Sequence, residues 1–546
     1  MTYTNCITVY RGDEIPKTPY KKKRDCYQQL NDYMLQETPP IGKICAIYGL
    51  RRTGKSVMML QCIDEMSEVQ RSKSVYLLCQ QGCDMYQLRL ILDSLLKEGI
   101  RNFFIDEITE VEDFQVYGNI LSDGYTLKGA KIAIAGTDSL GIRLAGMDIL
   151  YDRMVIIHTS RISYAEFSRL LDGKGIEQYI EYGGTLTDSQ YKTIQARDDY
   201  VNTAIVTNIL HSLEKNEEVR NYHPVLTELY ENKELVSVLN KMINKYSYYV
   251  TLKAINKCFK SAPLYSTIHN MDGQFAVENI DAEKVNLATK KALHIRNLDE
   301  METSLKPDDL DELKTYLKEL DLFLQIPCYK SLSKMQRDKD LEIVTQPGMI
   351  YAHASELMKV LSADEYWSEA CEIDDRKEFK KRADNFVKGI LLENIILSET
   401  YIWLQSIDAE RYYVSQLSTI LPESMQQVEA DLIIVDTETE EAHLFEIKFS
   451  DQQVEEQTKH LQNSEFIAYV DQNFGKVKSK TVIYNGADAE AFGVEYQNAE
   501  TFLCRIHKMK LDKKVELERL IALPENVSRT TEKSVKKIKK EMGPKL

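Results

Sequence analysis

Short apolar runs alternate with helical patterns in the first third of the chain. Each run is bounded by polar residues or glycine, as buried strands are, and between the runs apolar residues recur at helical spacing, as Val57, Leu60 and Ile63 do. This alternation predicts an α/β domain over residues 21–170, preceded by an extended arm at residues 1–20. The expected strands cover residues 44–48, 74–79, 102–105, 131–135 and 154–158.

The pattern becomes helical and charged between residues 171 and 345. We expect a helical lid over 171–240 and a winged-helix-like domain over 241–345, where helical spacing across 310–324 leads into a strand-like piece. A winged helix contacts DNA or packs between domains. A purely structural helical lid is the alternative interpretation.

A second α/β region is predicted at residues 350–505. A long helical run at 379–404 is followed by strand-like runs at 429–435 and 443–449, and the polar link between these two runs indicates a hairpin. Residues 506–546 form a basic helical tail that contains four lysines between 536 and 540. The tail either contacts phosphate backbones or is a solvated, frayed helix.

The loop after the first strand carries the most specific motif of the chain. Residues 49–56 read Gly-Leu-Arg-Arg-Thr-Gly-Lys-Ser, which is the G-x-x-x-x-G-K-S pattern of a phosphate-binding loop. The glycines allow a tight turn, the lysine reaches the β- and γ-phosphates, and the serine hydroxyl ligates Mg²⁺. We therefore predict that ATP and Mg²⁺ bind through Gly49, Arg51, Arg52, Thr53, Gly54, Lys55 and Ser56.

Two acidic residues complete the predicted nucleotide site. Asp106 and Glu107 follow the strand at 102–105, where Asp106 would hold Mg²⁺ through water and Glu107 would orient the attacking water. The same pair could instead cap the next helix. At the tip of the strand at 131–135, Thr137 is either a γ-phosphate sensor or an ordinary turn residue.

The predicted hairpin of the second α/β region carries a further group of charged residues. Asp431 is followed on the next strand by Glu446-Ile447-Lys448, so Glu446 and Lys448 share one face. This arrangement resembles the PD-(D/E)xK nuclease motif. Asp431 and Glu446 would bind Mg²⁺, Lys448 would orient the water, and Glu393 on the preceding helix would supply another acid. A cross-strand salt bridge is the alternative explanation.

These motifs together resemble the prokaryotic AAA-type ATPases that carry a C-terminal restriction-endonuclease-like domain. The resemblance covers residues 20–505. It implies ATP binding and hydrolysis, a winged-helix-like middle and a nuclease-like C-terminal region. It also places Arg153 at a family arginine that contacts a γ-phosphate of its own or a neighbouring subunit, although an ordinary surface arginine fits equally. The chain departs from the family at Arg161-Ile162, where Pro-Leu is usual, and at Ala430, where Pro is usual.

Composition restricts the partners of the protein. The 546 residues are 43% hydrophobic and 28% charged, and no apolar run is long enough for a membrane helix, so we expect a cytoplasmic protein. The net charge of −16 argues against a broad DNA-coating surface but allows a local basic groove. We expect ATP, and with it DNA or a homo-oligomer, as partners. A nuclease controlled by ATP, a non-cleaving ATP-dependent switch and a chaperone-like ATPase are the functions to be distinguished.

Overall fold

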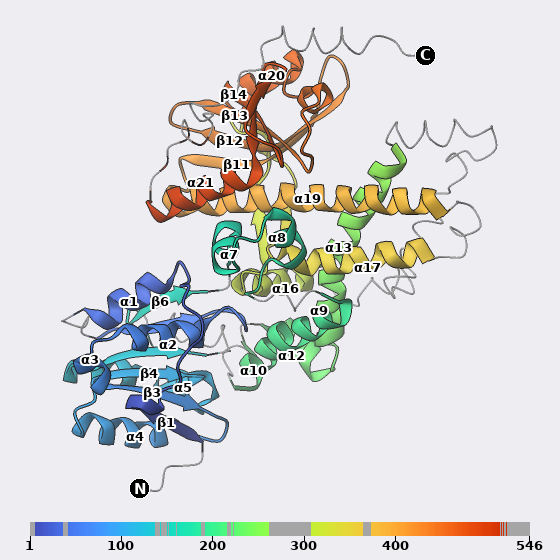
Figure 1. Ribbon diagram of the computed structural model, residues 1–546. Coiled ribbons are helices and arrows are strands. Elements are labelled where there is room, and N and C mark those ends of the chain that lie inside the picture. Colours follow the sequence, from blue (N-terminus) through green and yellow to red (C-terminus); the bar gives the residue numbers. More distant parts are fainter. Residues whose placement is uncertain are drawn as a thin grey trace.

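The computed structural model places two α/β regions at opposite ends of the molecule, with a helical region between them (Figure 1). It describes residues 6–36, 42–136, 152–159, 161–186, 192–215, 220–221, 223–260, 307–363 and 373–513, together with single positions at 142, 150, 515, 517 and 520. Within these residues, no helix is both long and apolar enough to cross a bilayer.

The first region is built on a six-stranded sheet with the order β1-β3-β4-β5-β2-β6. All neighbouring strands are parallel except β1, which pairs antiparallel with β3. The strands are β1 (Ile7–Arg11), β2 (Ile44–Tyr48), β3 (Ser74–Cys79), β4 (Asn102–Asp106), β5 (Lys131–Ala135) and β6 (Met154–His158). The five strands expected from the sequence are all present, and the expected N-terminal arm includes the edge strand β1.

Helices cover both faces of this sheet because alternate strand residues point to opposite sides. In β2, Ile44 and Ala46 share a core with one helix, whereas Cys45 and Ile47 pack with two others. The first core contains α4 (Met85–Lys97), and the second contains α1 (Tyr27–Leu35) and α2 (Lys55–Glu65). The short helices α3 (Glu68–Ser72) and α5 (Phe114–Tyr117) complete the region.

The middle region is mainly helical and contains one small β-ribbon. The ribbon pairs β7 with β10 antiparallel, and a second pair, β8 with β9, lies within it in the sequence. The helices are α7 (Tyr164–Leu170), α8 (Ile176–Tyr182), α9 (Ile194–Tyr200), α10 (Thr207–Lys215), α12 (Pro224–Glu231), α13 (Leu235–Lys260), α16 (Pro307–Glu319) and α17 (Pro347–Ala363). The strands are β7 (Phe323–Ile326), β8 (Tyr329–Ser331), β9 (Gln336–Arg337) and β10 (Leu341–Val344).

This arrangement changes the expected domain boundaries. The limit drawn at residue 240 falls inside α13, which runs without a break from Leu235 to Lys260. A helix followed by a ribbon is present, as α16 and β7–β10. Residues 261–306 lie outside the described part of the chain, so the winged-helix fold stays a prediction.

The C-terminal region has a second six-stranded sheet with the order β11-β12-β13-β14-β16-β15. The expected hairpin is β12–β13, and β13 pairs parallel with β14 after a crossover through α20. Its elements are α19 (Ile373–Ile407), β11 (Tyr412–Ile420), β12 (Gln427–Asp436), β13 (Glu441–Lys448), α20 (Ser464–Asn473), β14 (Lys476–Tyr484), β15 (Ala489–Ala491), β16 (Val494–Asn498) and α21 (Ala499–Leu511). Residues 521–546, which include the lysine-rich run, lie outside the described residues. The domain boundary expected at residue 505 falls inside α21.

The C-terminal region is joined to the first α/β region through α7 and α8. One hydrophobic core contains Phe167 and Tyr179 from these helices together with Phe502 from α21. The carboxylate of Glu399 on α19 accepts a hydrogen bond from the Tyr164 backbone N–H (2.6 Å). These contacts connect residues 350–505 to α7 and α8.

Candidate nucleotide and metal sites

The loop at residues 49–56 adopts the conformation that its glycines allow. It leaves β2 at Gly49, which has φ 147°, and enters α2 at Gly54, which has φ 92°. A side chain at position 54 would also lie 3.2 Å from Leu186. The backbone N–H groups at the start of α2 therefore face the space beyond the carboxyl end of β2, where a helix N-terminus favours phosphate.

Lys55 is buried and folded back on its own loop. Its ammonium donates hydrogen bonds to the backbone oxygens of Gly49 (2.8 Å) and Leu50 (3.0 Å). Burial lowers the pKa of Lys55 to about 8, even though Glu107 and Asp106 act in the opposite direction. The arginines contribute differently: the charge of Arg51 also lowers the pKa of Lys55, and Arg52 lies near Tyr200.

Asp106 is held in place at the end of β4 by a tyrosine from the next strand. The Tyr76 hydroxyl donates to Asp106 Oδ2 (2.5 Å), and the Glu107 backbone N–H donates to Oδ1 (3.0 Å). The Ser56 hydroxyl also interacts with Tyr76, so Tyr76 joins the two predicted magnesium ligands. Burial is the main reason that the pKa of Tyr76 is raised, which keeps its hydroxyl a donor.

A buried arginine links the loop to the helices behind it. Arg24 donates to the Thr53 backbone oxygen, to the Thr159 backbone oxygen (3.0 Å) and to Glu166 Oε1 (2.5 Å). The Thr53 hydroxyl lies 2.7 Å from that of Thr159. Thr53 therefore anchors the loop, and its position depends on Arg24.

The remaining predictions for this region have different outcomes. Thr137 lies outside the described residues. Arg153 precedes β6 and accepts a backbone hydrogen bond from Ile44, the first residue of β2, whereas the phosphate loop follows the last residue of that strand. Five strand residues span roughly 16 Å. Arg153 pairs with Asp123 (3.1 Å), and its place at the other end of β2 disfavours contact with the γ-phosphate of its own subunit. Contact with the nucleotide of a neighbouring subunit stays a prediction.

In the C-terminal region, Asp431, Glu446 and Lys448 lie together. Lys448 Nζ lies 3.0 Å from Asp431 Oδ2 and 2.5 Å from Glu446 Oε2, and both carboxylates are 4% exposed. Burial, and after it the charge of Asp431, keeps the pKa of Glu446 above its ordinary value, against the opposing effect of Lys448. Burial alone would lower the pKa of Lys448, but the neighbouring acids Asp431, Glu446 and Glu393 raise it.

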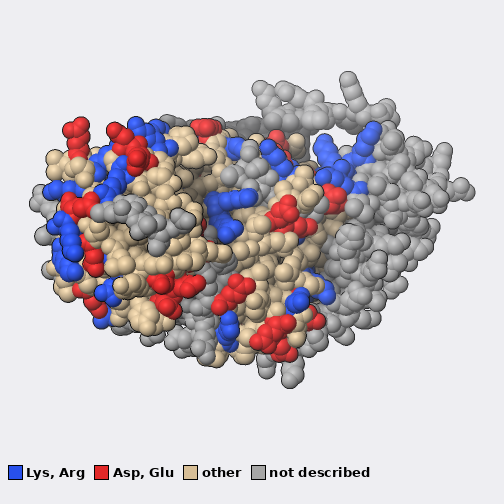
Figure 2. Space-filling view, turned by 90° about the horizontal axis from the view of Figure 1, so that it is seen from below, with Lys and Arg blue, Asp and Glu red and all other residues tan. Residues whose placement is uncertain are grey.

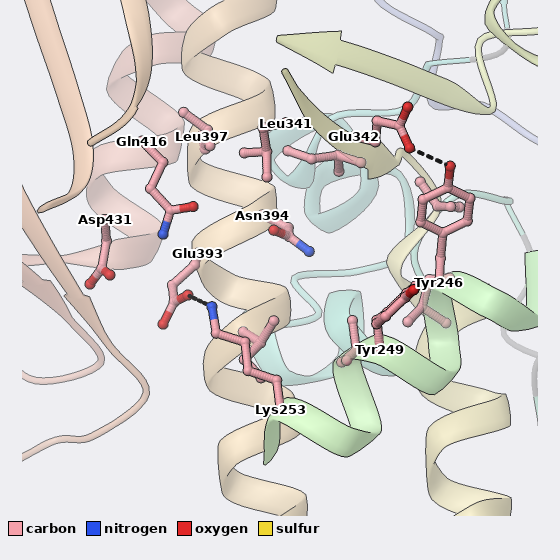
Figure 3. A pocket seen from close by; sticks show the side chains of 15 residues that line it. Tyr246, Tyr249, Lys253, Leu341, Glu342, Glu393, Asn394, Leu397, Gln416 and Asp431 are labelled. Carbon is pink, nitrogen blue, oxygen red and sulfur yellow. Dashed lines mark hydrogen bonds and ion pairs between the residues drawn. The ribbon is translucent and has the colours of Figure 1, made fainter. Parts of the chain in front are cut away.

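Further polar residues extend this site. His460 Nδ1 lies 3.2 Å from Glu446 Oε1, and this hydrogen bond raises the pKa of His460. Gln416 occupies an irregularity in the pairing of β11 with β12, and a bulge of this kind re-aims a side chain. Glu393, Gln416 and Asp431 line one cavity of about 170 Å³ and face one another across it (Figure 3). All four residues predicted for a nuclease-like site are therefore in one place.

Residues 42–168 match the model of a protein family described as an AAA domain. The match covers the α/β region that carries the phosphate loop. It supports an AAA-type P-loop ATPase domain there, a family that binds nucleotide. No curated protein matched the chain.

Several solved structures share a weak likeness with parts of the chain. The Saccharomyces cerevisiae Hsp104–ADP complex is 12% identical, with 67% of this chain and 48% of that chain covered and a TM-score of 0.23. The Hsp104–casein complex in its extended conformation is 13% identical, with 51% and 50% covered and a TM-score of 0.26. Aeropyrum pernix ORC1 in complex with DNA is 12% identical, with 66% and 96% covered and a TM-score of 0.24. The chain spans about half the length of the Hsp104 chains, and TM-scores this low support no functional conclusion.

Sequence reasoning missed several residues around both sites. Tyr76 carried a signal, because it is a hydroxyl-bearing residue within the apolar run of the strand beside the Asp106 strand. Gln416 carried a weaker one as a polar residue among strand-forming neighbours. Arg24 and His460 carried none, since only the fold of the AAA domain and of the second sheet brings them to Thr53 and Glu446.

Proposed function

We propose that this protein hydrolyses ATP to control a metal-dependent, nuclease-like site that acts on DNA. The observation that carries the proposal is helix α13. Its 26 residues span about 39 Å and connect the phosphate loop of the AAA domain with the cavity that contains Glu393 and Asp431.

The first half of α13 shares a core with the phosphate loop. Leu50, at the second position of the loop, is 1% exposed and packs in one cluster with Leu239 and Met242 of α13. A change in the loop when it binds or releases phosphates would therefore reach this helix through the shared core. Close-packed cores transmit such shifts because they do not deform continuously.

The second half of α13 borders the candidate nuclease site. Lys253 Nζ lies 3.9 Å from Glu393 Oε2, and Tyr249 lines the same cavity (Figure 3). A cavity of about 170 Å³ is smaller than the 300–1,000 Å³ of typical ligand pockets. A phosphodiester reaches the site from this side only after α13 moves, so the helix would act as a gate.

In the ATP reaction, the residues of the AAA domain would divide the work. Lys55 would exchange its two backbone carbonyls for phosphate oxygens. Ser56 and Asp106 supply the oxygen donors that Mg²⁺ prefers, and Tyr76 holds them in register. Glu107 would orient the attacking water and accept its proton.

The donor atoms of the second site also fit a hard cation. Asp431 and Glu446 offer carboxylate oxygens and Gln416 an amide oxygen. A bound Mg²⁺ or Mn²⁺ would supply Lewis-acid stabilisation of the scissile phosphate. Lys448 would orient the attacking water on the same face. Since Lys448 contacts both carboxylates, a metal would compete with its ammonium for them.

A non-cleaving switch is the second candidate function, in which the C-terminal region only binds DNA or protein. It is favoured by the internal pairing of Lys448 with both acids. It is also favoured by the finding that, among the described residues, no three His, Cys, Asp or Glu side chains are grouped closely enough to hold a metal ion. In this case α13 would still respond to nucleotide.

Two measurements on the full chain separate these functions. In a duplex-DNA cleavage assay with Mn²⁺, we expect weak cleavage that is lost in Asp431→Ala and rises several-fold in Lys253→Ala. The matched control Lys245→Ala, an exposed lysine of the same helix, should leave the rate unchanged. In hydrogen exchange, Mg·ATPγS should change the protection of residues 246–255 in the wild type but not in Lys55→Ala.

The cleavage and hydrogen-exchange results together distinguish the two candidate functions. Exchange that responds to nucleotide without any cleavage would favour the switch. Cleavage that is unaffected by Lys253→Ala, together with unchanged exchange, would disprove control through α13.

A further inference from the structure

A basic recess lies where the three regions of the protein meet. It has a volume of about 320 Å³ and includes Arg161 from the segment after β6, Lys318 from α16, Arg337 from β9 and Tyr401 from α19. The residues come from four separate elements, so the recess exists only in the folded chain. It is distinct from both sites described above.

The charges of the recess differ from those of the protein as a whole. The chain carries a net charge of −16, yet three of the four charged residues that line the recess are cations and only Asp340 is an acid. Acidic and basic side chains are interspersed over the described part of the face in Figure 2. The recess is therefore lined by more positive than negative side chains, which favours the binding of an anion.

The existing partners leave these cations available for an anion. Lys318 donates to the side-chain oxygen of Gln325, which is neutral. Arg337 Nη2 lies 3.6 Å from Asp340, is highly exposed, and is therefore held only weakly. Arg161 is held more firmly, 2.9 Å from Asp321, which fixes the direction of its guanidinium.

Two further groups of the recess suit a nucleotide rather than a bare phosphate. Tyr401 lines the recess, and a tyrosine ring is a side chain on which a flat base can stack. Asp340 accepts a hydrogen bond from Gln325 (2.8 Å), and carboxylates of this kind also accept hydrogen bonds from ribose hydroxyls. The volume lies at the lower end of small-ligand pockets and corresponds to one nucleotide unit.

We propose that this recess binds a mononucleotide unit, with its phosphate on Lys318, Arg337 and Arg161 and its base against Tyr401. The unit is either a free nucleoside monophosphate or a terminal nucleotide of a single strand, since both present the same chemistry.

The position of Arg161 connects the recess to the phosphate loop. The Arg161 backbone oxygen accepts a hydrogen bond from Arg24 (3.2 Å), and Arg24 also donates to Thr53. On the side-chain path, Asp321 lies 2.6 Å from His158, whose ring stacks on Tyr48, the residue before Gly49. Occupancy of the recess would therefore affect the AAA domain through Arg161 and Asp321.

Isothermal titration calorimetry on the full chain tests this proposal, with saturating Mg·ADP present to occupy the phosphate loop. One arm titrates AMP, a second titrates the 5′-phosphorylated thymidine dinucleotide, and a third titrates inorganic phosphate. We expect saturable binding in the first or second arm, tighter than that of phosphate. The arm that binds more tightly identifies the source of the nucleotide unit.

Variants establish where the probe binds. Lys318→Ala combined with Arg337→Ala should weaken binding tenfold or more, because each removes a charge-assisted contact. Tyr401→Leu should weaken it less, through the loss of stacking. Lys330→Ala, an exposed lysine on β8 outside the recess, is the matched control and should bind as the wild type does. Absence of saturable binding in both nucleotide arms, or equal affinity in the double variant with unchanged melting temperature, would overturn the proposal.

Discussion

The two candidate sites each contain a lysine beside two acids, but these lysines are in opposite electrostatic states. Lys55 of the AAA domain bonds only to neutral backbone oxygens of its own loop, and burial lowers its pKa to about 8. Lys448 lies between Asp431 and Glu446, and these carboxylates outweigh burial and raise its pKa. The ammonium of Lys55 is hydrogen-bonded to uncharged backbone groups, whereas that of Lys448 is paired with two carboxylates of the protein.

The difference separates a site that depends on its ligand from a site that is stable without one. A buried lysine without a charged partner stabilises the folded state little, but it binds phosphates strongly because the loop is already organised around it. A buried carboxylate pair with its lysine makes the fold sensitive to the loss of any one member, since that loss leaves a buried charge uncompensated. The predictions below test this contrast, in order of decreasing expected effect.

The largest effect should come from Glu107, which acts on the ligand and not on the fold. Glu107→Gln should lower the ATP hydrolysis rate about 10²–10⁴-fold, since the general base is lost, with ATP affinity kept. Steady-state phosphate release and calorimetric ATP binding measure the two quantities. Asp106→Asn, the control at the neighbouring acid, should weaken Mg·ATP binding. Wild-type hydrolysis by Glu107→Gln would show that the base is another residue.

The contact between α19 and α7 contains a further buried acid, Glu399, which should make the stability of the protein depend on pH. Burial raises the pKa of Glu399 to about 7 from its ordinary 4.5. The neutral form of Glu399 is therefore favoured in the folded state. Its contribution to the free energy of unfolding is fully present below pH 4.5 and is lost as pH rises through 7. At about 1.4 kcal/mol per pKa unit, the loss amounts to about 3 kcal/mol.

Melting temperatures from pH 5 to pH 8 measure this loss. The wild type should lose stability relative to Glu399→Gln as pH increases. Glu500→Gln is the matched control, because Glu500 accepts a hydrogen bond from Ile176 at the contact between α21 and α8. Parallel pH profiles for the wild type and Glu399→Gln would mean that Glu399 is ionised in the folded protein at all these pH values.

Metal binding at Asp431 and Glu446 should stabilise the protein by a smaller but measurable amount. Mn²⁺ at 100 times its dissociation constant should stabilise the full chain by about 2.7 kcal/mol. Asp431→Ala should abolish this gain. Lys448→Met should increase metal affinity, because the ammonium no longer competes for Asp431 and Glu446. Equal stabilisation of the wild type and Asp431→Ala would place the metal elsewhere.

The sequence predicted elements well where the signal is local. The apolar runs at 44–48, 74–79, 131–135 and 154–158 became strands with the same limits, because each run is bounded by residues that end a strand. The phosphate loop and the Asp431, Glu446 and Lys448 group were found for the same reason, since their spacing along the chain is itself the signal.

What the sequence could not predict depends on contacts between distant segments. Leu50 could be any residue in the motif, and its burial against α13 follows only from the packing of the middle region. The position of Arg153 required the strand order, which places it at the opposite end of β2 from the loop. The boundary expected at residue 240 lies inside α13, whose side chains belong to two cores. The charge pattern of this helix does not change between them.

Thermal melting of Lys55→Met and Lys448→Met, each with and without Mg·ATPγS, tests the contrast between the two sites most directly. We predict that Lys448→Met lowers stability without nucleotide, by about 1–3 kcal/mol, because two buried carboxylates lose their partner. It should keep the full gain from nucleotide. Lys55→Met should keep or slightly increase stability without nucleotide and lose that gain. A nucleotide gain that survives Lys55→Met, or an unchanged stability of Lys448→Met, would contradict this account.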